Sequence, residues 1–240
     1  MSFLPLLVFL TFLSLIIALG WLIPRQKYKK RQELAQTLAA QRGWTFLANP
    51  AYDRHLIYLL VNHDHQPQWE LVGTKSHSTG GRSQLPAGNR WHTETIRLTD
   101  DKIVIGPVAA PAVAKAITGR GFTGFIMNFV LAPYGVGELS GLAPQMVGSS
   151  LFEQRFFCLS RQEKIARQII SPTIEHELLK WPITSNPHHQ PWIVIDSGGI
   201  TIRLFDDRPE TETARLDQLV YLGLALSQAT ATFHSQGNRV

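Results

Sequence analysis

The sequence predicts an α+β fold, in which mostly antiparallel strands and segregated helices follow one N-terminal transmembrane helix. Short apolar, β-branched runs separated by turn-forming residues predict the strands. Longer segments that repeat apolar side chains every three or four positions predict the helices. The chain has 240 residues, of which 44% are hydrophobic, and one cysteine, so its composition excludes a disordered chain and a disulfide framework.

The transmembrane helix is predicted from 21 uncharged residues, Phe3–Ile23. At ~1.5 Å per residue, a helix of this length spans the hydrocarbon core of a bilayer, which is ~30 Å thick. A cleaved signal peptide is the alternative, and it would make the remaining chain a secreted domain. It fits less well because the positive charges follow the apolar run rather than precede it.

A cluster of five positive charges comes directly after this run and before Glu33, the first acidic residue. Its members are Arg25, Lys27, Lys29, Lys30 and Arg31. Because positive charge stays on the cytoplasmic side, the pattern predicts an external N-terminus and a cytoplasmic C-terminal domain in the cell membrane. We expect these five residues to contact the membrane surface, where anionic lipids attract them.

The rest of the chain carries no excess charge. Five of the 23 basic residues belong to this cluster, so the remaining 18 balance the 18 acidic residues. A nucleic-acid-binding domain would spread its basic residues over one face, so we predict no nucleic-acid partner. The predicted partner is the lipid bilayer, and a protein partner is not identified by any motif.

The charge and hydropathy pattern divides the chain into four parts. Residues 1–24 are the predicted transmembrane anchor, 25–43 a basic juxtamembrane helix, 44–234 the α+β globular domain and 235–240 a tail. Gly43 follows Arg42 as a helix stop. We expect a fragment that starts near Gln32 to fold on its own, because over 200 residues can bury a core.

Within the first half of the domain, the strand Trp44–Leu47 ends at Asn49-Pro50, a pair typical of a helix start. A helix is expected next, with Tyr52, Leu56 and Leu60 on one face. Three further strands are predicted at Gln68–Thr74, Arg90–Leu98 and Lys102–Pro107.

The last third gives the clearest pattern. Leu151–Leu159 is predicted as a strand, Ser160 and Glu163 as a capping box that opens a helix, and Ser171-Pro172 as the start of another. Two β-branched runs around Asp196-Ser197-Gly198-Gly199 predict a hairpin. A final helix is expected from about Pro209 to Phe233, with Leu216, Leu219, Val220, Gly223 and Leu226 on its core face.

Two segments carry a resemblance to known proteins: Ala39-Ala40-Gln41-Arg42-Gly43-Trp44-Thr45-Phe46, and Leu151-Phe152-Glu153-Gln154-Arg155-Phe156-Phe157. With the N-terminal anchor, the basic stop and the closing hairpin and helix, they resemble an uncharacterised bacterial family of N-terminally membrane-anchored proteins with a cytoplasmic α+β domain. The resemblance implies the architecture and assigns no catalytic residue.

Motifs that could carry chemistry are few. His63, Asp64 and His65 could bind a metal ion, because imidazole and carboxylate groups are metal ligands. Gly119–Gly124 matches a dinucleotide-binding pattern but lacks the preceding strand and the acidic residue that this mechanism requires. Cys158 lies in an aromatic run and is expected in the core.

The function predicted from these observations is that of a single-pass membrane protein whose cytoplasmic domain is a binding or scaffold module. We predict no catalytic, cofactor or metal site. The alternative is a membrane-bound metal-assisted hydrolase that uses His63, Asp64 and His65. The apolar, glycine-rich segment Gly121–Gly137 has three open interpretations: a buried part of the domain, a membrane-interface or partner-contact loop, or a second span.

Overall fold

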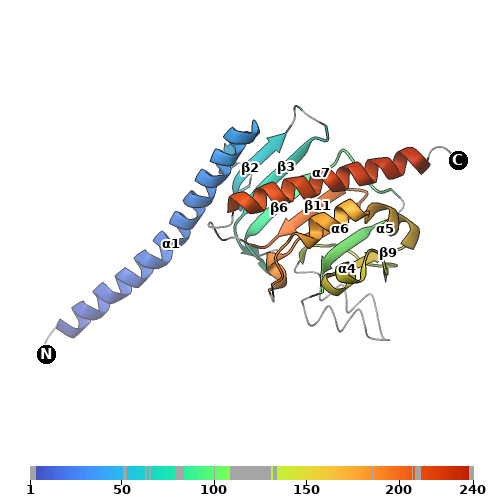
Figure 1. Cartoon of the computed structure of the whole chain (residues 1–240). Helices are drawn as coiled ribbons and strands as arrows, with labels where there is room; N and C mark the ends of the chain where they lie inside the picture. The colour runs from blue at the N-terminus through green and yellow to red at the C-terminus, as the bar shows by residue number, and fades with distance from the viewer. Residues whose placement is uncertain are drawn as a thin grey trace.

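The predicted α+β class is confirmed by the computed structural model, which describes residues 4–50, 53–62, 64, 66–78, 84–99, 101–108, 131, 134–184, 186–206, 208 and 212–237 (Figure 1). Over these residues, nine strands form one antiparallel sheet in the order β1-β2-β3-β6-β11-β10-β7-β9-β8. A separate pair, β4 (His77–Ser78) and β5 (Gln84–Leu85), forms a short hairpin.

The nine strands of the large sheet are β1 (Thr45–Ala48), β2 (Leu56–Asn62), β3 (Trp69–Thr74), β6 (Gly88–Thr93), β7 (Ile103–Pro107), β8 (Ala143–Pro144), β9 (Phe156–Ser160), β10 (Trp192–Asp196) and β11 (Gly199–Leu204). The helices in the described residues are α1 (Leu4–Arg42), α4 (Ser150–Arg155), α5 (Glu163–Ile169), α6 (Pro172–Leu179), the 3-10 turn η2 (Pro187–His189) and α7 (Glu212–Gly237).

One face of the sheet is covered by helices and holds the main core. α7 runs across this face, and the C-terminal part of α1 and the helices α5 and α6 pack beside it (Figure 1). Gly223 of α7 lies directly over the Trp91 indole, where a methyl group would come within 2.5 Å of the ring. The core residues predicted for the final helix are confirmed, since Leu216, Leu219 and Leu226 are buried.

The opposite face of the sheet is covered over β7, β9 and β10. There Trp192 and Phe157 pack with residues of the connection that precedes α4, among them Leu131 and Val136. These two residues belong to the segment Gly121–Gly137, and both are buried. Residues 121–130, 132 and 133 lie outside the described residues, so the buried interpretation is supported only for the C-terminal part of that segment.

Two predicted elements are wrong. The segment with Leu56 and Leu60, predicted as a helix, is strand β2, whose first six residues are all buried. A strand that is buried and apolar at every position shows no alternation, so the spacing of two leucines does not define a period. The predicted strand Leu151–Leu159 is divided into α4 and β9, because the Ser149 hydroxyl caps a helix by accepting a hydrogen bond from the Phe152 amide.

Other local predictions are confirmed, with one change. The hairpin at 192–205 and the helix that begins at Pro172 are present, and Gly43 ends α1 with φ = +71°. α5 forms where expected, but Ser160 is not its cap. The Ser160 hydroxyl instead donates a hydrogen bond to the buried Asp101 carboxylate at 2.6 Å, and no side chain caps α5.

α1 extends far beyond the domain. Its C-terminal part contributes Ala35, Leu38 and Ala39 to the main core, whereas its N-terminal part projects away from the sheet (Figure 1). Among the side chains that the structure describes, which leave out residues 1–8, 17 and 19–21, no helix is long and apolar enough to cross a membrane.

Two aromatic side chains test the core assignment. Trp181 and Phe156 are 2% and 1% exposed, so Trp181→Ala and Phe156→Ala should each lower the free energy of unfolding by about 3–5 kcal/mol. Ile183, which is 82% exposed, provides the control: Ile183→Ala should change it by less than about 0.5 kcal/mol. Urea unfolding of the full chain in a mild detergent measures all three, and equal effects would show that the core assignment is wrong.

Candidate functional site

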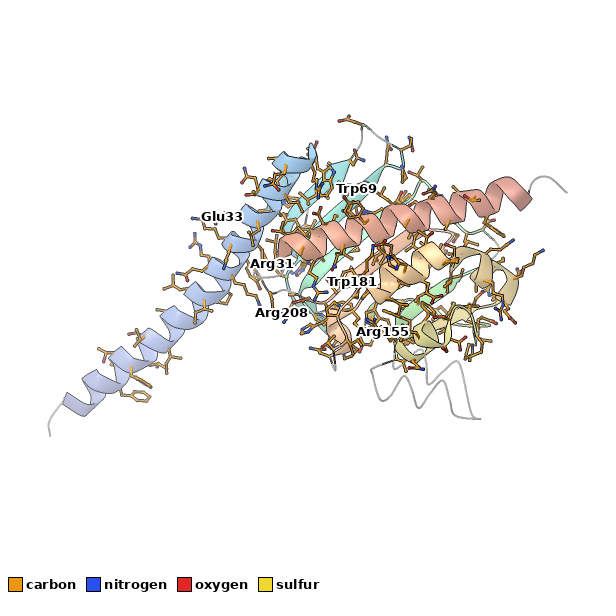
Figure 2. All side chains as sticks on the ribbon, viewed as in Figure 1. Arg31, Glu33, Trp69, Arg155, Trp181 and Arg208 are labelled. Carbon is orange, nitrogen blue, oxygen red and sulfur yellow. The ribbon has the colours of Figure 1, made fainter. Side chains whose placement is uncertain are left out.

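Arg31 does not lie on the surface with the other members of the basic cluster. Its side chain is 0% exposed and is held between α1, the sheet and α7 (Figure 2). The predicted membrane-surface contact is therefore wrong for Arg31, because the guanidinium is enclosed by protein. Arg25, Lys29 and Lys30 are exposed and Lys27 is half-buried, and for these four residues the membrane-surface contact stays a prediction.

The buried guanidinium is saturated with acceptors. It donates from Nε to Glu212 Oε1 at 3.1 Å and from Nη2 to Asn89 Oδ1 at 2.9 Å and to the Gly88 carbonyl at 3.1 Å. A weaker contact from Nη1 reaches the Thr74 carbonyl at 3.4 Å. Arginine suits such a site because its planar group presents several donors in fixed directions.

The anion in this cluster is Glu212, which is also buried. Burial raises the pKa of Glu212, and the opposing effects of Arg31 and of the Tyr58 hydroxyl, 2.5 Å away, favour the carboxylate. The Tyr58 pKa is in turn well above its usual value because of burial and the neighbouring Glu212 charge. The four side chains of Arg31, Tyr58, Asn89 and Glu212 are hereafter called the junction, since they connect α1, β2, β6 and α7.

The junction also bears on the predicted start of the globular domain. The sequence placed 25–43 outside the globular domain, but a fragment that starts at Gln32 lacks Arg31 and leaves Glu212 buried without its counter-charge. Arg31, from the predicted juxtamembrane helix, is therefore buried in the same cluster as residues of the domain, and the predicted division at residue 44 stays a prediction.

The histidine cluster is mostly outside the described residues. His63 and His65 are not described, and Asp64 is exposed. In the described part of the chain, no three His, Cys, Asp or Glu side chains are arranged to hold a metal ion. The glycine motif Gly119–Gly124 lies wholly outside the described residues, and Cys158 is buried in the core, where burial raises its pKa to about 12.

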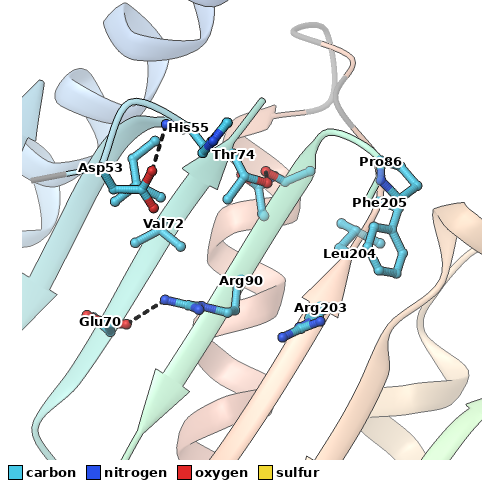
Figure 3. A pocket seen from close by; sticks show the side chains of 13 residues that line it. Asp53, His55, Glu70, Val72, Thr74, Pro86, Arg90, Arg203, Leu204 and Phe205 are labelled. Atoms are coloured by element: carbon cyan, nitrogen blue, oxygen red, sulfur yellow. Dashed lines mark hydrogen bonds and ion pairs between the residues drawn. The ribbon is translucent and has the colours of Figure 1, made fainter. Parts of the chain in front are cut away.

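A pocket that the sequence did not predict lies on the sheet face opposite α7, over β2, β3, β6 and β11 (Figure 3). Alternation along the strands places Leu71, Trp91 and Ile202 under the helices and their neighbours on this open face. The pocket volume is about 310 Å³. Its lining residues are Asp53, His55, Leu56, Glu70, Val72, Thr74, Pro86, Gly88, Asn89, Arg90, Arg203, Leu204 and Phe205.

Charged groups are concentrated at one end of this pocket. Arg90 Nη2 donates to Glu70 Oε1 at 2.9 Å, and Arg203 lies beside Arg90 on the next strand (Figure 3). Burial, together with the Arg90 charge, lowers the pKa of Arg203. Asp53, near the other end of the view, accepts a hydrogen bond from the His55 amide at 2.7 Å.

The junction and the pocket share residues through the sheet. Arg31 hydrogen-bonds to Thr74, Gly88 and Asn89, and all three line the pocket. The end of the pocket formed by these residues is therefore fixed by a side chain of α1.

Comparison with known proteins adds no assignment. No family model matches the chain, and no curated protein matches it. A solved structure, that of the mycobacterial trehalose monomycolate transport factor A, TtfA, is similar with a TM-score of 0.47 and 7% sequence identity, over 85% of this chain and 94% of that chain. A likeness at this level carries no functional argument, and the resemblance to a membrane-anchored bacterial family stays a prediction.

The junction predicts a large and specific stability effect. Arg31→Met should lower the free energy of unfolding by about 3–5 kcal/mol, because Glu212 then remains buried and unpaired. The double variant Arg31→Met/Glu212→Gln should recover part of that loss, because both charges are removed.

Lys30→Met is the matched control, since Lys30 is exposed one position earlier on the same helix. It should change stability by less than about 0.5 kcal/mol in urea unfolding of the full chain. Equal effects of Arg31→Met and Lys30→Met would contradict the assignment of Arg31 to the core.

Proposed function

We propose that this protein is a single-pass membrane-anchored binding module, with its N-terminus outside and its pocket-bearing domain at the cytoplasmic surface of the membrane. The segment Phe3–Ile23 would form the anchor, and Arg25, Lys27, Lys29 and Lys30 would contact the lipid headgroups. The pocket on the open sheet face would bind the ligand.

The anchor is supported by where the apolar side chains of α1 lie. Phe9, Phe12, Ile16 and Ile23 are among eight large apolar side chains between residues 9 and 23 that are more than two-fifths exposed. No charged residue interrupts this stretch of the helix. A helix that is apolar all round requires an apolar environment, and lipid provides one.

The basic residues that follow are arranged in a way that suits a headgroup layer. Arg25 and Lys29 of α1 and Lys75 after β3 line one open groove of about 570 Å³. Tyr28, in the same groove, has the amphipathic ring that is enriched at membrane interfaces, and Lys75 Nζ lies 5.8 Å from its centroid. Lys75 therefore extends the predicted membrane-contact surface from the helix to the domain.

The binding role rests chiefly on the link between α1 and the pocket. Arg31 contacts three residues that line the pocket, and it lies eight residues after Ile23, or ~12 Å along a helix at ~1.5 Å per residue. A pocket held this way would keep a fixed position close to the bilayer. No described residue favours the alternative hydrolase built on His63, Asp64 and His65.

Membrane topology gives the direct test. A reporter that is active only in the cytoplasm, fused after Val240, should be active, and alkaline carbonate should leave the protein in the membrane fraction. Neutral substitution of Arg25, Lys27, Lys29 and Lys30 should weaken this orientation, because these charges retain the domain on the cytoplasmic side.

Arg31 is left unchanged in this test, because its replacement would destabilise the domain. The control variant neutralises four exposed basic residues elsewhere, Arg54, Arg97, Arg161 and Lys164, and should keep the wild-type orientation. Reporter activity only outside the cytoplasm, or release by carbonate, would contradict the proposal.

A further inference from the structure

Two arginines face each other across neighbouring strands in the pocket. Arg90 of β6 and Arg203 of β11 are directly paired in the ladder, and both line the pocket. Side chains at paired positions have Cβ atoms ~5 Å apart, and like charges placed there destabilise a sheet. This arrangement therefore needs compensation by negative charge.

The compensation within the protein is incomplete. Glu70 pairs with Arg90 through Nη2 at 2.9 Å, but Arg90 Nε is buried and has no hydrogen-bond acceptor. Arg203 reaches only the Tyr134 carbonyl, at 3.4 Å, and no carboxylate of the described residues lies within ion-pair distance of it. One guanidinium charge and one buried N–H group are therefore left for a ligand.

We infer that this end of the pocket binds the anionic group of a small amphipathic molecule, a carboxylate or a phosphate. Guanidinium groups bind both anions through paired, charge-assisted hydrogen bonds. The apolar part of the ligand would lie against Val72, Pro86 and Phe205, which line the same cavity. A volume of about 310 Å³ suits a small molecule rather than a macromolecule. The inference rests on the proposed binding role and names the ligand class of that pocket.

A ligand role and a structural role for Arg203 predict opposite effects on stability. If Arg203 served the fold, its removal would destabilise the protein. In a ligand site without its anion, Arg203 is partly desolvated and faces Arg90, so Arg203→Gln should leave the midpoint of thermal unfolding unchanged or raise it. In that case the wild-type protein keeps Arg203 for ligand binding, although the side chain lowers the stability of the ligand-free fold.

The experiment titrates the full chain, in a non-ionic detergent and a phosphate-free buffer, with phenyl phosphate and with benzoate. Both should bind saturably in calorimetry and raise the midpoint of unfolding, and binding should weaken as the salt concentration increases. Benzyl alcohol and benzylamine, a neutral and a cationic analogue, should not bind. Whichever of the two anions binds more tightly identifies the preferred group.

Three variants test the assignment. Arg203→Gln should weaken anion binding by about tenfold or more, since a charged donor pair is lost. Glu70→Gln should strengthen it, because Arg90 then loses its competing carboxylate. Arg97→Gln, an exposed arginine outside the pocket, should bind like the wild type. If Arg203→Gln does not fold, the structural role is correct and the inference fails.

Equal binding of the neutral analogue, absence of binding by both anions, or unchanged affinity in both Arg203→Gln and Glu70→Gln would also overturn the inference. These outcomes are separate from failure of the proposed membrane placement, which is measured by carbonate extraction and by the reporter. If the protein stays in the membrane with its domain in the cytoplasm but binds neither anion, the proposed membrane placement stands. Only the inferred ligand class then fails.

Discussion

The buried pair of Arg31 and Glu212 is the constraint on which the rest of the domain depends. Removing two charges from water costs several kcal/mol for each ion, so the pair is tolerated only where hydrogen bonds replace the lost hydration. The junction provides them through Asn89, Tyr58 and the backbone of two strands. α1, α7 and the centre of the sheet are thereby fixed in one arrangement, because any displacement would leave a buried charge without its partner.

Much of the fold could be predicted from local pattern, because turns, caps and half-buried strands depend on neighbouring residues. The hairpin around Asp196–Gly199 and the helix at Pro172 are examples. β2 was misassigned because both of its faces are buried, so its apolar run carries no period. α4 was missed because one serine cap converts the start of an aromatic run into a helix.

The candidate site could not be predicted in the same way. Arg203 lies far from Glu70 and Arg90 in the chain and joins them only because β6 and β11 are neighbours, an order that no local pattern reveals. Arg31 was grouped with its basic neighbours because its counter-ion lies near the other end of the chain. The helical repeat offered one signal: Arg31, Ala35 and Leu38 lie three or four positions apart and share the buried face of α1.

The separation of Arg31 and Glu212, 181 residues, also sets the order of events during synthesis. A growing chain cannot complete the main core until its last helix, 26 residues long, has left the ribosome. Until then Arg31, Tyr58 and Asn89 lack the Glu212 carboxylate, and the helical face of the sheet lacks the cover that α7 provides. The domain therefore completes its core only after α7 has been synthesised, and any product truncated before Glu212 would present an incompletely covered apolar face to the cell's chaperones and proteases.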